Sequence, residues 1–227
     1  MIRYLQGLLT IPEDAQTDAA SLEHMRAAFR NLPVLESDRL LLRAPRIHDA
    51  EDMYAYARDA ENCRYVMWEA HANVWESRDA LRSIIHRNRR GGPGTYAIEL
   101  KSEARMIGTI GFQWIDAQHG SGEVGYSIAR RLWNHGLATE ALRTLLPFAF
   151  DTLGLRRVEA RHDMLNPASG QVMSHAGFRP EGIARGSVRV KGRMADMACY
   201  AILREDWQAL MGVEGNPGIG GQKEGGR

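Results

Sequence analysis

The chain has 227 residues, of which 44% are hydrophobic and 25% are charged, and its formal net charge at pH 7 is +1. These proportions are ordinary for a globular chain that buries a core, so they argue against extensive disorder and against a membrane protein, and the length favours one domain. Because the net charge is almost zero, we expect no overall attraction to nucleic acid or to an acidic membrane surface.

Cysteine usage and the N-terminal segment predict a cytoplasmic protein without a metal site. Cys63 and Cys199 lie far apart and lack the paired spacing of zinc ligands, so we expect no bound metal and a reducing compartment. The first apolar run is interrupted at Gln6 and Gly7. It is therefore shorter than the roughly 7–15 apolar residues of a signal sequence or the roughly 20 of a membrane span.

We divide the chain into an N-terminal extension with one helix (residues 1–34), a folded domain (35–210) and a Gly-rich tail (211–227) that is predicted to be disordered. The helix of the extension is expected where Met25 and Phe29 share one face. It is predicted to pack on the domain as an added helix.

The domain is predicted to open with a strand in SDRLLLRAP, because Leu40 and Leu42 lie on one face and Pro45 stops the run. Two helices should follow, over residues 47–57 and from about 76 to 89. The segments TYAIELK, RMIGTIGFQWI and SGEVGYSI then predict three strands that form a meander.

The second half of the domain is predicted to begin with a helix from Gly136 to about Leu153, kinked at Pro147, which cannot donate a backbone hydrogen bond. A strand in LRRVEARHDM and a short helix in NPASGQVMSHAGF come next. Two strands, near residues 182–190 and 194–203, are expected to finish the domain.

The start of the helix at Gly136 is the first candidate binding site. Backbone N–H groups in the first turn of a helix lack internal partners, and together with the helix dipole they favour an anion. Gly136 and Ala138 have little or no side chain to block close approach, which suits a pyrophosphate. Taken alone, Gly136 is better explained as a tight turn. The segment lacks a Walker GK[ST] and a dinucleotide-binding glycine pattern, so nucleotide hydrolysis is not expected.

Four segments follow one another over about residues 35–207: LESDRLLLRAP, GEVGYSIARRLWNHGLATEAL, NPASGQVMSHAGFRPEG and KGRMADMACYAIL. In this order they resemble the opening strand, the acetyl-CoA loop and helix, the Asn-x-x-Ser helix and the closing strand of the GNAT acyltransferases, within their ribosomal-protein N-acetyltransferase branch. The resemblance implies an α+β fold with a mostly antiparallel twisted sheet, a splayed parallel strand pair and helices on both faces. It also implies direct transfer of an acetyl group from acetyl-CoA to a primary amine.

The same resemblance assigns cofactor-binding residues. The pyrophosphate would lie on backbone N–H groups at the helix start, while the backbone of Ile128 would hold the pantetheine and polarise the thioester carbonyl. Asn166 is expected to contact the cofactor, although Asn before Pro also suits a helix N-cap. Asn134 stands where the family commonly has Gly, which predicts a less flexible loop. The cofactor loop comprises Trp133, Asn134, His135, Gly136, Leu137, Ala138 and Thr139.

Two residues are assigned to the chemistry. Ser169, from the Asn-x-x-Ser motif, is the candidate that protonates or hydrogen-bonds the departing thiolate. Glu123 is the first candidate for the base, because an amine arrives protonated at neutral pH and Glu123 lies on the strand beside the expected thioester. A solvated or salt-bridged strand carboxylate explains Glu123 equally well. Glu181 and Asp196 are weaker alternatives for the base.

Two further groups of residues have competing explanations. The run HRNRR, residues 86–90, could contact the CoA adenosine phosphate or RNA, but cations that interact favourably with the end of a helix dipole are the preferred explanation. Bulky aromatic residues more often pack in a core than line a substrate cleft. The aromatic residues open to both roles are Tyr65, Trp68, Trp75 and Trp114.

The acceptor stays open between a protein N-terminus and a small amine such as a polyamine or an aminoglycoside. A clearly acidic cleft would favour a polycation, whereas an open groove would favour a peptide. A hypothesis from another class is a non-catalytic acyl-CoA-binding regulatory module that kept the cofactor loop and lost its base. The resemblance also raises the expectation of a homodimer, since dimers are common in this branch.

Overall fold

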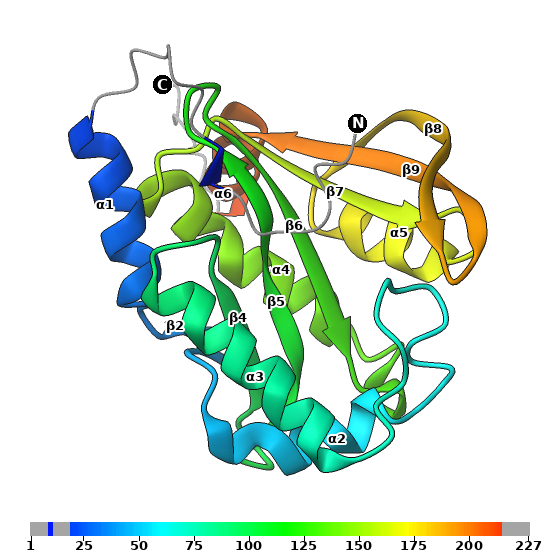
Figure 1. Ribbon diagram of the computed structural model, residues 1–227. Coiled ribbons are helices and arrows are strands. Elements are labelled where there is room, and N and C mark those ends of the chain that lie inside the picture. Colours follow the sequence, from blue (N-terminus) through cyan, green and yellow to red (C-terminus); the bar gives the residue numbers. More distant parts are fainter. Residues whose placement is uncertain (1–8, 11–18, 215–227) are drawn as a thin grey trace, which may run out of the picture.

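A computed structural model describes residues 9–10 and 19–214 of the chain. The strands of these residues form one mixed sheet in the order β2-β3-β4-β5-β6-β7-β9-β8, with β1 paired to β5 (Figure 1). Their bounds are β1 Leu9–Thr10, β2 Leu35–Glu36, β3 Leu40–Arg43, β4 Thr95–Leu100, β5 Arg105–Asp116, β6 Ser121–Ile128, β7 Arg157–Asp163, β8 Arg179–Val190 and β9 Arg193–Leu203.

Helices cover both faces of this sheet. Figure 1 shows α3 in front of the sheet and α4 behind it. None of the helices in the described part of the chain is long and apolar enough to span a membrane. The helix bounds are α1 Ala19–Arg30, α2 Ala50–Ala57, α3 Val74–Arg89, α4 Leu137–Pro147, α5 Pro167–His175 and α6 Arg204–Glu214.

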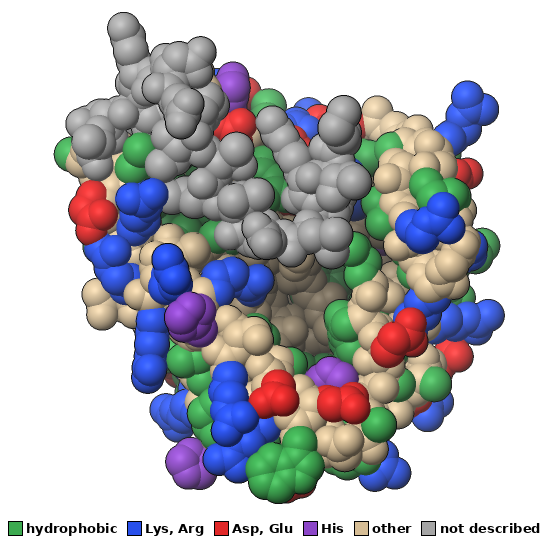
Figure 2. All heavy atoms as spheres, in the orientation of Figure 1, with side chains coloured by type: hydrophobic (Ala, Val, Ile, Leu, Met, Phe, Trp, Pro, Cys, Tyr) green, Lys and Arg blue, Asp and Glu red, His purple; other side chains and the backbone are tan. Residues whose placement is uncertain are grey.

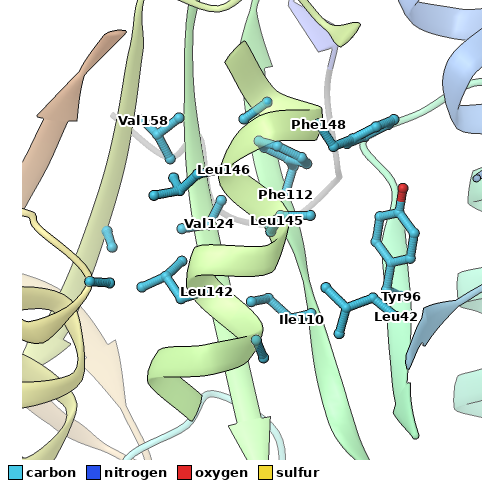
Figure 3. Close-up of a cluster of buried hydrophobic side chains, with 14 of the residues drawn as sticks. Leu42, Tyr96, Ile110, Phe112, Val124, Leu142, Leu145, Leu146, Phe148 and Val158 are labelled. Atoms are coloured by element: carbon cyan, nitrogen blue, oxygen red, sulfur yellow. The ribbon is translucent and has the colours of Figure 1, made fainter. Parts of the chain in front are cut away.

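The main core lies between the sheet and α4, and Figure 3 shows its side chains pointing toward one another. The predicted faces are buried here: Leu40 and Leu42 of β3 are 0% exposed. Phe29 of α1 also reaches this core and makes edge contacts with the rings of Phe112 and Phe148 at centroid distances of 5.9 and 6.1 Å. The added N-terminal helix therefore packs on the domain, as its pattern of apolar residues predicted.

The strands β4, β5 and β6 form the predicted antiparallel meander. The strand pair β6 and β7 is parallel, and its register runs from Ser121 opposite Arg157 to Val124 opposite Ala160. Beyond that point the two strands no longer pair with each other, although β6 continues to Ile128 beside β5 and β7 to Asp163 beside β9. The sheet therefore opens into a gap between β6 and β7, which confirms the predicted splayed parallel pair.

Several element boundaries differ from the predictions for identifiable reasons. Helix α3 begins at Val74, because the side chain of Asn73 caps it by accepting hydrogen bonds from the backbone N–H groups of the second and third helical residues at 3.0 and 3.2 Å. The α-helical pattern of α4 ends at Pro147, and the chain continues as a π-helical turn over Phe148–Thr152. The predicted change at Pro147 is thus a change of hydrogen-bond pattern, which the missing N–H of proline explains.

Three elements of the described residues were not predicted, namely the short strands β1 and β2 and the C-terminal helix α6. Helix α6 is anchored by Trp207, which is 9% exposed and stacks on Phe150 at a centroid distance of 5.1 Å. Residues 211–214, assigned to the tail, belong to this helix. The rest of the tail, residues 215–227, lies outside the described residues, so its disorder stays a prediction.

Candidate active site

The edge of β6 that faces the gap carries unpaired backbone. The N–H of Ala129 donates to the carbonyl of Ile107 on β5. Because backbone groups alternate in direction along an antiparallel ladder, those of Tyr126 and Ile128 point the other way, toward the gap. The carbonyl of Ile128 accepts a hydrogen bond from the indole of Trp133 at 2.8 Å. This bond ties the end of β6 to the predicted cofactor loop and leaves the N–H of Ile128 as the group directed to the gap.

The loop before α4 has the conformation that its residues permit. Gly136 takes the left-handed conformation with φ of 75°, and Asn134 does so with φ of 63°. Asn is among the few other residues that tolerate this region, which explains how it can replace a glycine here. Among the described residues, no side chain caps the first turn of α4. The N–H groups of Leu137, Ala138 and Thr139 therefore retain the anion-binding capacity expected from the sequence.

A network that the sequence did not reveal holds this helix start against β3. The carboxylate of Glu140 accepts hydrogen bonds from the hydroxyl of Ser37 at 2.7 Å and from the backbone and Nε of Arg39 at 2.9 and 2.6 Å. Arg39 also donates to the carbonyl of His135 at 3.0 Å. Burial opposes ionisation of Glu140, but these hydrogen bonds outweigh it and lower its pKa. Glu140 thus binds Arg39 and leaves the helix start free of its own carboxylate.

A cleft of about 380 Å³ extends from α3 across the gap to α5. Figure 2 shows the surface hollowed in this region. Glu123, Asn166 and Ser169 all line the cleft, so the structure brings together these three predicted site residues from β6 and from the start of α5. The side chain of Asn166 makes no capping hydrogen bond. Asn166 thus occupies the N-cap position before Pro167, as the alternative explanation expects, but its side chain is not used as a cap.

Glu123 is a buried carboxylate with a defined set of partners. It is 6% exposed. Its Oε2 accepts hydrogen bonds from the indole of Trp114 at 3.0 Å and from Nε of Arg161 at 2.9 Å. Burial raises the pKa of Glu123 to about 7, and the Trp114 hydrogen bond opposes this rise. The Arg161 cation favours the ionised form as well, so Glu123 is an ion-paired carboxylate that is also suited to take up a proton near neutral pH.

Ser169 has a partner that the sequence analysis missed. The hydroxyl of Tyr126 donates to the backbone carbonyl of Ser169 at 2.9 Å and lies 3.0 Å from its Oγ. Burial raises the pKa of Tyr126 well above its ordinary value, although its hydrogen bond to Ser169 opposes this rise. Tyr126 therefore remains protonated and presents an O–H to Ser169. The GY pair in GEVGYSI was visible in the sequence, but only the splayed strands bring Tyr126 to α5.

Side chains alternate along β6, and this alternation separates two kinds of group at the gap. Glu123 lies on the α3 side with Gly125, whereas Tyr126 points to α5 on the other side.

The weaker candidates for the base are elsewhere. Glu181 is bound to Arg157 at 2.7 Å, and Asp196 is exposed and accepts a hydrogen bond from the backbone of β8. Neither of these two carboxylates lines the cleft.

The aromatic candidates divide between the cleft and the surface. Tyr65, Trp68 and Trp114 line the cleft. Trp75 does not, since it is 62% exposed and stacks with the guanidinium of a neighbouring arginine. Arg87, from the HRNRR run at the end of α3, also lines the cleft. The preferred explanation of that run, a favourable interaction with the helix dipole alone, is therefore incomplete for Arg87.

Another cavity, of about 490 Å³, lies between α2 and the start of β5. Its charged residues are all in ion pairs: Asp52 with Arg105, Asp59 with Arg130, and Arg131 with Glu103 outside the lining. None of the predicted site residues lines it. Among the described residues, no cluster of His, Cys, Asp and Glu could hold a metal ion.

Comparisons with known proteins agree with this geometry. Residues 39–179 match the family model described as "Acetyltransferase (GNAT) domain". The uncharacterized N-acetyltransferase p20 of Bacillus licheniformis is 30% identical over 176 residues, which cover 78% of this chain and 99% of that protein. The [ribosomal protein uS5]-alanine N-acetyltransferase of Escherichia coli (strain K12) is 26% identical over 184 residues, covering 76% and 92% of the two chains.

A solved structure has the same fold. The Microcin C7 self immunity acetyltransferase MccE, determined in complex with acetyl-CoA and AMP, superposes with a TM-score of 0.68 at 20% identity, covering 74% of this chain and 93% of that chain. The GNAT model matches well over half of the 227 residues, and p20 is matched over nearly its whole length. The chain therefore belongs to the GNAT acetyltransferase family, with ribosomal-protein N-acetyltransferases among its relatives.

Proposed function

We propose that this N-acetyltransferase takes an acetyl group from acetyl-CoA on the α4–α5 side of the gap and transfers it to a primary amine in the cleft. One observation carries the proposal: the gap between β6 and β7 has Glu123 on one side and the hydroxyl pair of Tyr126 and Ser169 toward α5, and all three residues line the same cleft. A base for the amine and a proton donor for the leaving group are thereby held on the two sides of one opening. This division is what an acyl transfer requires.

The donor side has groups that fit acetyl-CoA, which GNAT acetyltransferases use. The uncapped first turn of α4, with Gly136 at its start, would bind the pyrophosphate. The N–H of Ile128, directed to the gap, would donate to the thioester carbonyl, on which negative charge develops during transfer. Asn166 lines the same region from the start of α5. Acetyl-CoA supplies the acetyl group as a thioester, whose carbon–sulfur bond breaks as a carbon–nitrogen bond forms.

Protons are handled by the side chains at the gap. Glu123 would take the proton that the ammonium group must lose before its nitrogen can attack. Its pKa of about 7, raised by burial, matches that task at neutral pH. On the other side, the hydroxyl of Ser169 would give a proton to the departing thiolate and regain one from solvent, while the hydroxyl of Tyr126, 3.0 Å from the Ser169 Oγ, would orient it.

A peptide N-terminus is the acceptor that the observations favour over a polycation. The cleft has two acidic residues in its lining, Glu123 and Asp163, and each is paired with an arginine. A polyamine or an aminoglycoside would find little uncompensated negative charge there. The relationship to a ribosomal-protein alanine N-acetyltransferase supports the same choice.

The proposal is tested by mixing the purified protein with acetyl-CoA and a panel of amines while free thiol is followed. The panel contains a short peptide with a free N-terminus, the same peptide already N-acetylated, a polyamine and an aminoglycoside. We expect thiol release with the free peptide and none with its acetylated form. Tight binding of acetyl-CoA without thiol release for any amine would contradict the proposal and favour the non-catalytic module.

A further inference from the structure

Arg87 is a partly buried cation at the cleft whose charge has no counterion in the described part of the chain. It follows the buried face of α3 into the cleft, where its Nη2 donates to the hydroxyl of Thr95 at 2.6 Å. Its Nε is buried and has no hydrogen-bond partner among the described residues. A guanidinium has five N–H donors, so one hydroxyl leaves most of its capacity unused.

The other charges that line the cleft are already compensated. Glu123 is bound to Arg161, and Asp163 is bound to Arg193. Arg87 forms no ion pair with any carboxylate of the described residues, so it leaves the cleft with one uncompensated positive charge. Burying a cation without an anion is costly, and a bound anion would remove that cost. The burial also lowers the pKa of Arg87, although the guanidinium remains protonated.

The register of the sheet relates Arg87 to the proposed reaction point. Thr95 on β4 lies opposite Gly111 on β5, which lies opposite Gly125 on β6, beside the place where pairing with β7 ends. Two strand spacings correspond to roughly 10 Å. A straight path therefore leads across the cleft from the partner of Arg87 to the gap.

Glycines lie along this path at positions where neighbouring groups pack closely. A Cβ on Gly111 would lie 2.4 Å from the carbonyl of Gly94, and one on Gly125 would lie 2.6 Å from the side chain of Gln113. Both positions therefore lack side chains for steric reasons, and both line the cleft. The floor between Arg87 and Glu123 is therefore built of close-packed backbone and of the side chains of Thr95 and Gln113, which line the cleft and offer polar groups to a ligand.

We propose that Arg87 binds an anionic group of the acceptor, so that the substrate is a primary amine carrying a carboxylate or phosphate roughly 10 Å from its nitrogen. A guanidinium binds either group through paired hydrogen bonds. This inference rests on the proposed function, because the amine is placed at Glu123. Three residues of extended peptide have about the required length, at roughly 3.3–3.6 Å per residue.

The test compares matched acceptors that differ only in the anion. Trialanine with a free carboxylate is compared with trialanine amide, and Ala-Ala-phosphoserine amide with Ala-Ala-serine amide. For each pair, both kcat/KM with acetyl-CoA and the binding constant by calorimetry with CoA present are measured. We expect at least one anionic peptide to be preferred by about tenfold or more. The arm that gives the larger preference identifies the anion as a carboxylate or a phosphate.

Variants at the end of α3 connect the preference to Arg87. In Arg87→Gln, the ratio of kcat/KM for the anionic peptide to that for the neutral peptide should fall to about one. Arg87→Lys should keep part of this preference, because the positive charge remains. Arg89→Gln is the matched control, since Arg89 is an exposed arginine of the same helix end that does not line the cleft. It should leave the wild-type preference unchanged.

The possible failures are distinguishable. If the wild-type protein has equal kcat/KM and equal affinity for the anionic and the neutral peptides, the inference is overturned without any variant. An unchanged preference in Arg87→Gln would overturn it as well. Failure of every anionic peptide to bind would count against it as well. If binding prefers the anion through Arg87 but no peptide releases thiol, the proposed function fails and the anion site stands.

Discussion

Acetyl transfer should decline below pH 7 in proportion to the ionised fraction of Glu123. Only the carboxylate can accept a proton from the amine, and burial raises the pKa of this group from 4.5 to about 7. The sign follows directly: catalysis by Glu123 is fully available above the raised pKa and is lost as the pH falls through it.

The size of the decline follows from the raised pKa. With a pKa of about 7, about one tenth of Glu123 is ionised at pH 6, so kcat/KM should fall to about one tenth of its plateau. A carboxylate with the ordinary value of 4.5 would remain almost fully ionised there. Trp114→Phe removes a hydrogen bond that favours the carboxylate, so it should raise the pKa and move the decline to higher pH.

The assay is kcat/KM by thiol release with a peptide amine, from about pH 5.5 to about pH 9. The α-amino group of the acceptor adds its own inflection to the pH profile near pH 8, and this inflection moves when the acceptor is changed. The inflection that belongs to Glu123 should instead move in Trp114→Phe. Glu123→Gln should cost about 10²- to 10⁴-fold in kcat and abolish the lower limb, with acetyl-CoA binding retained. A limb near pH 7 that persists in Glu123→Gln would refute the assignment of the base.

Three further changes test the donor side and the core. Gly136→Ala should lower the free energy of unfolding by about 1–2 kcal/mol, because φ is 75°, and it should also weaken acetyl-CoA binding. Gly154→Ala is the control, since φ is 71° there and the space around it is open. It should cost as much stability but leave the affinity for acetyl-CoA unchanged. Ser169→Ala should lower kcat without changing the Kd of CoA, and Tyr126→Phe should have the same sign; unchanged kcat in both would remove this proton donor. Phe29→Ala should lower the free energy of unfolding by about 3–5 kcal/mol in urea titrations, and a loss below 1 kcal/mol would mean that α1 is not part of the core.

The local elements of the fold could be predicted because their causes are local. Alternating apolar residues in SDRLLLRAP indicated a strand whose Leu40 and Leu42 are indeed buried. The anion-binding potential of the α4 start follows from Gly136 and the unpaired N–H groups of any first helical turn. Helix α6 was missed because Trp207 is held by Phe150, a contact between residues far apart in sequence.

The chemical state of the site could not be predicted, because it depends on residues that only folding brings together. Glu123 was equally well explained as a base or as a salt-bridged carboxylate, and it has both properties because Trp114 and Arg161 approach it from the two neighbouring strands in a buried setting. Tyr126 was not recognised, since nothing in GEVGYSI indicates a partner on α5.

The sequence by itself determined most of the element order and the helix start that suits a pyrophosphate, because periodicity and backbone capacity are properties of neighbouring residues, and the resemblance of four of its segments indicated the class of protein. Only the tertiary structure decided which of several similar charges acts at the site. Arg87 and Arg89 are indistinguishable in HRNRR, yet one enters the cleft and the other remains in water. The difference arises because burial and charge compensation depend on elements that meet across the sheet.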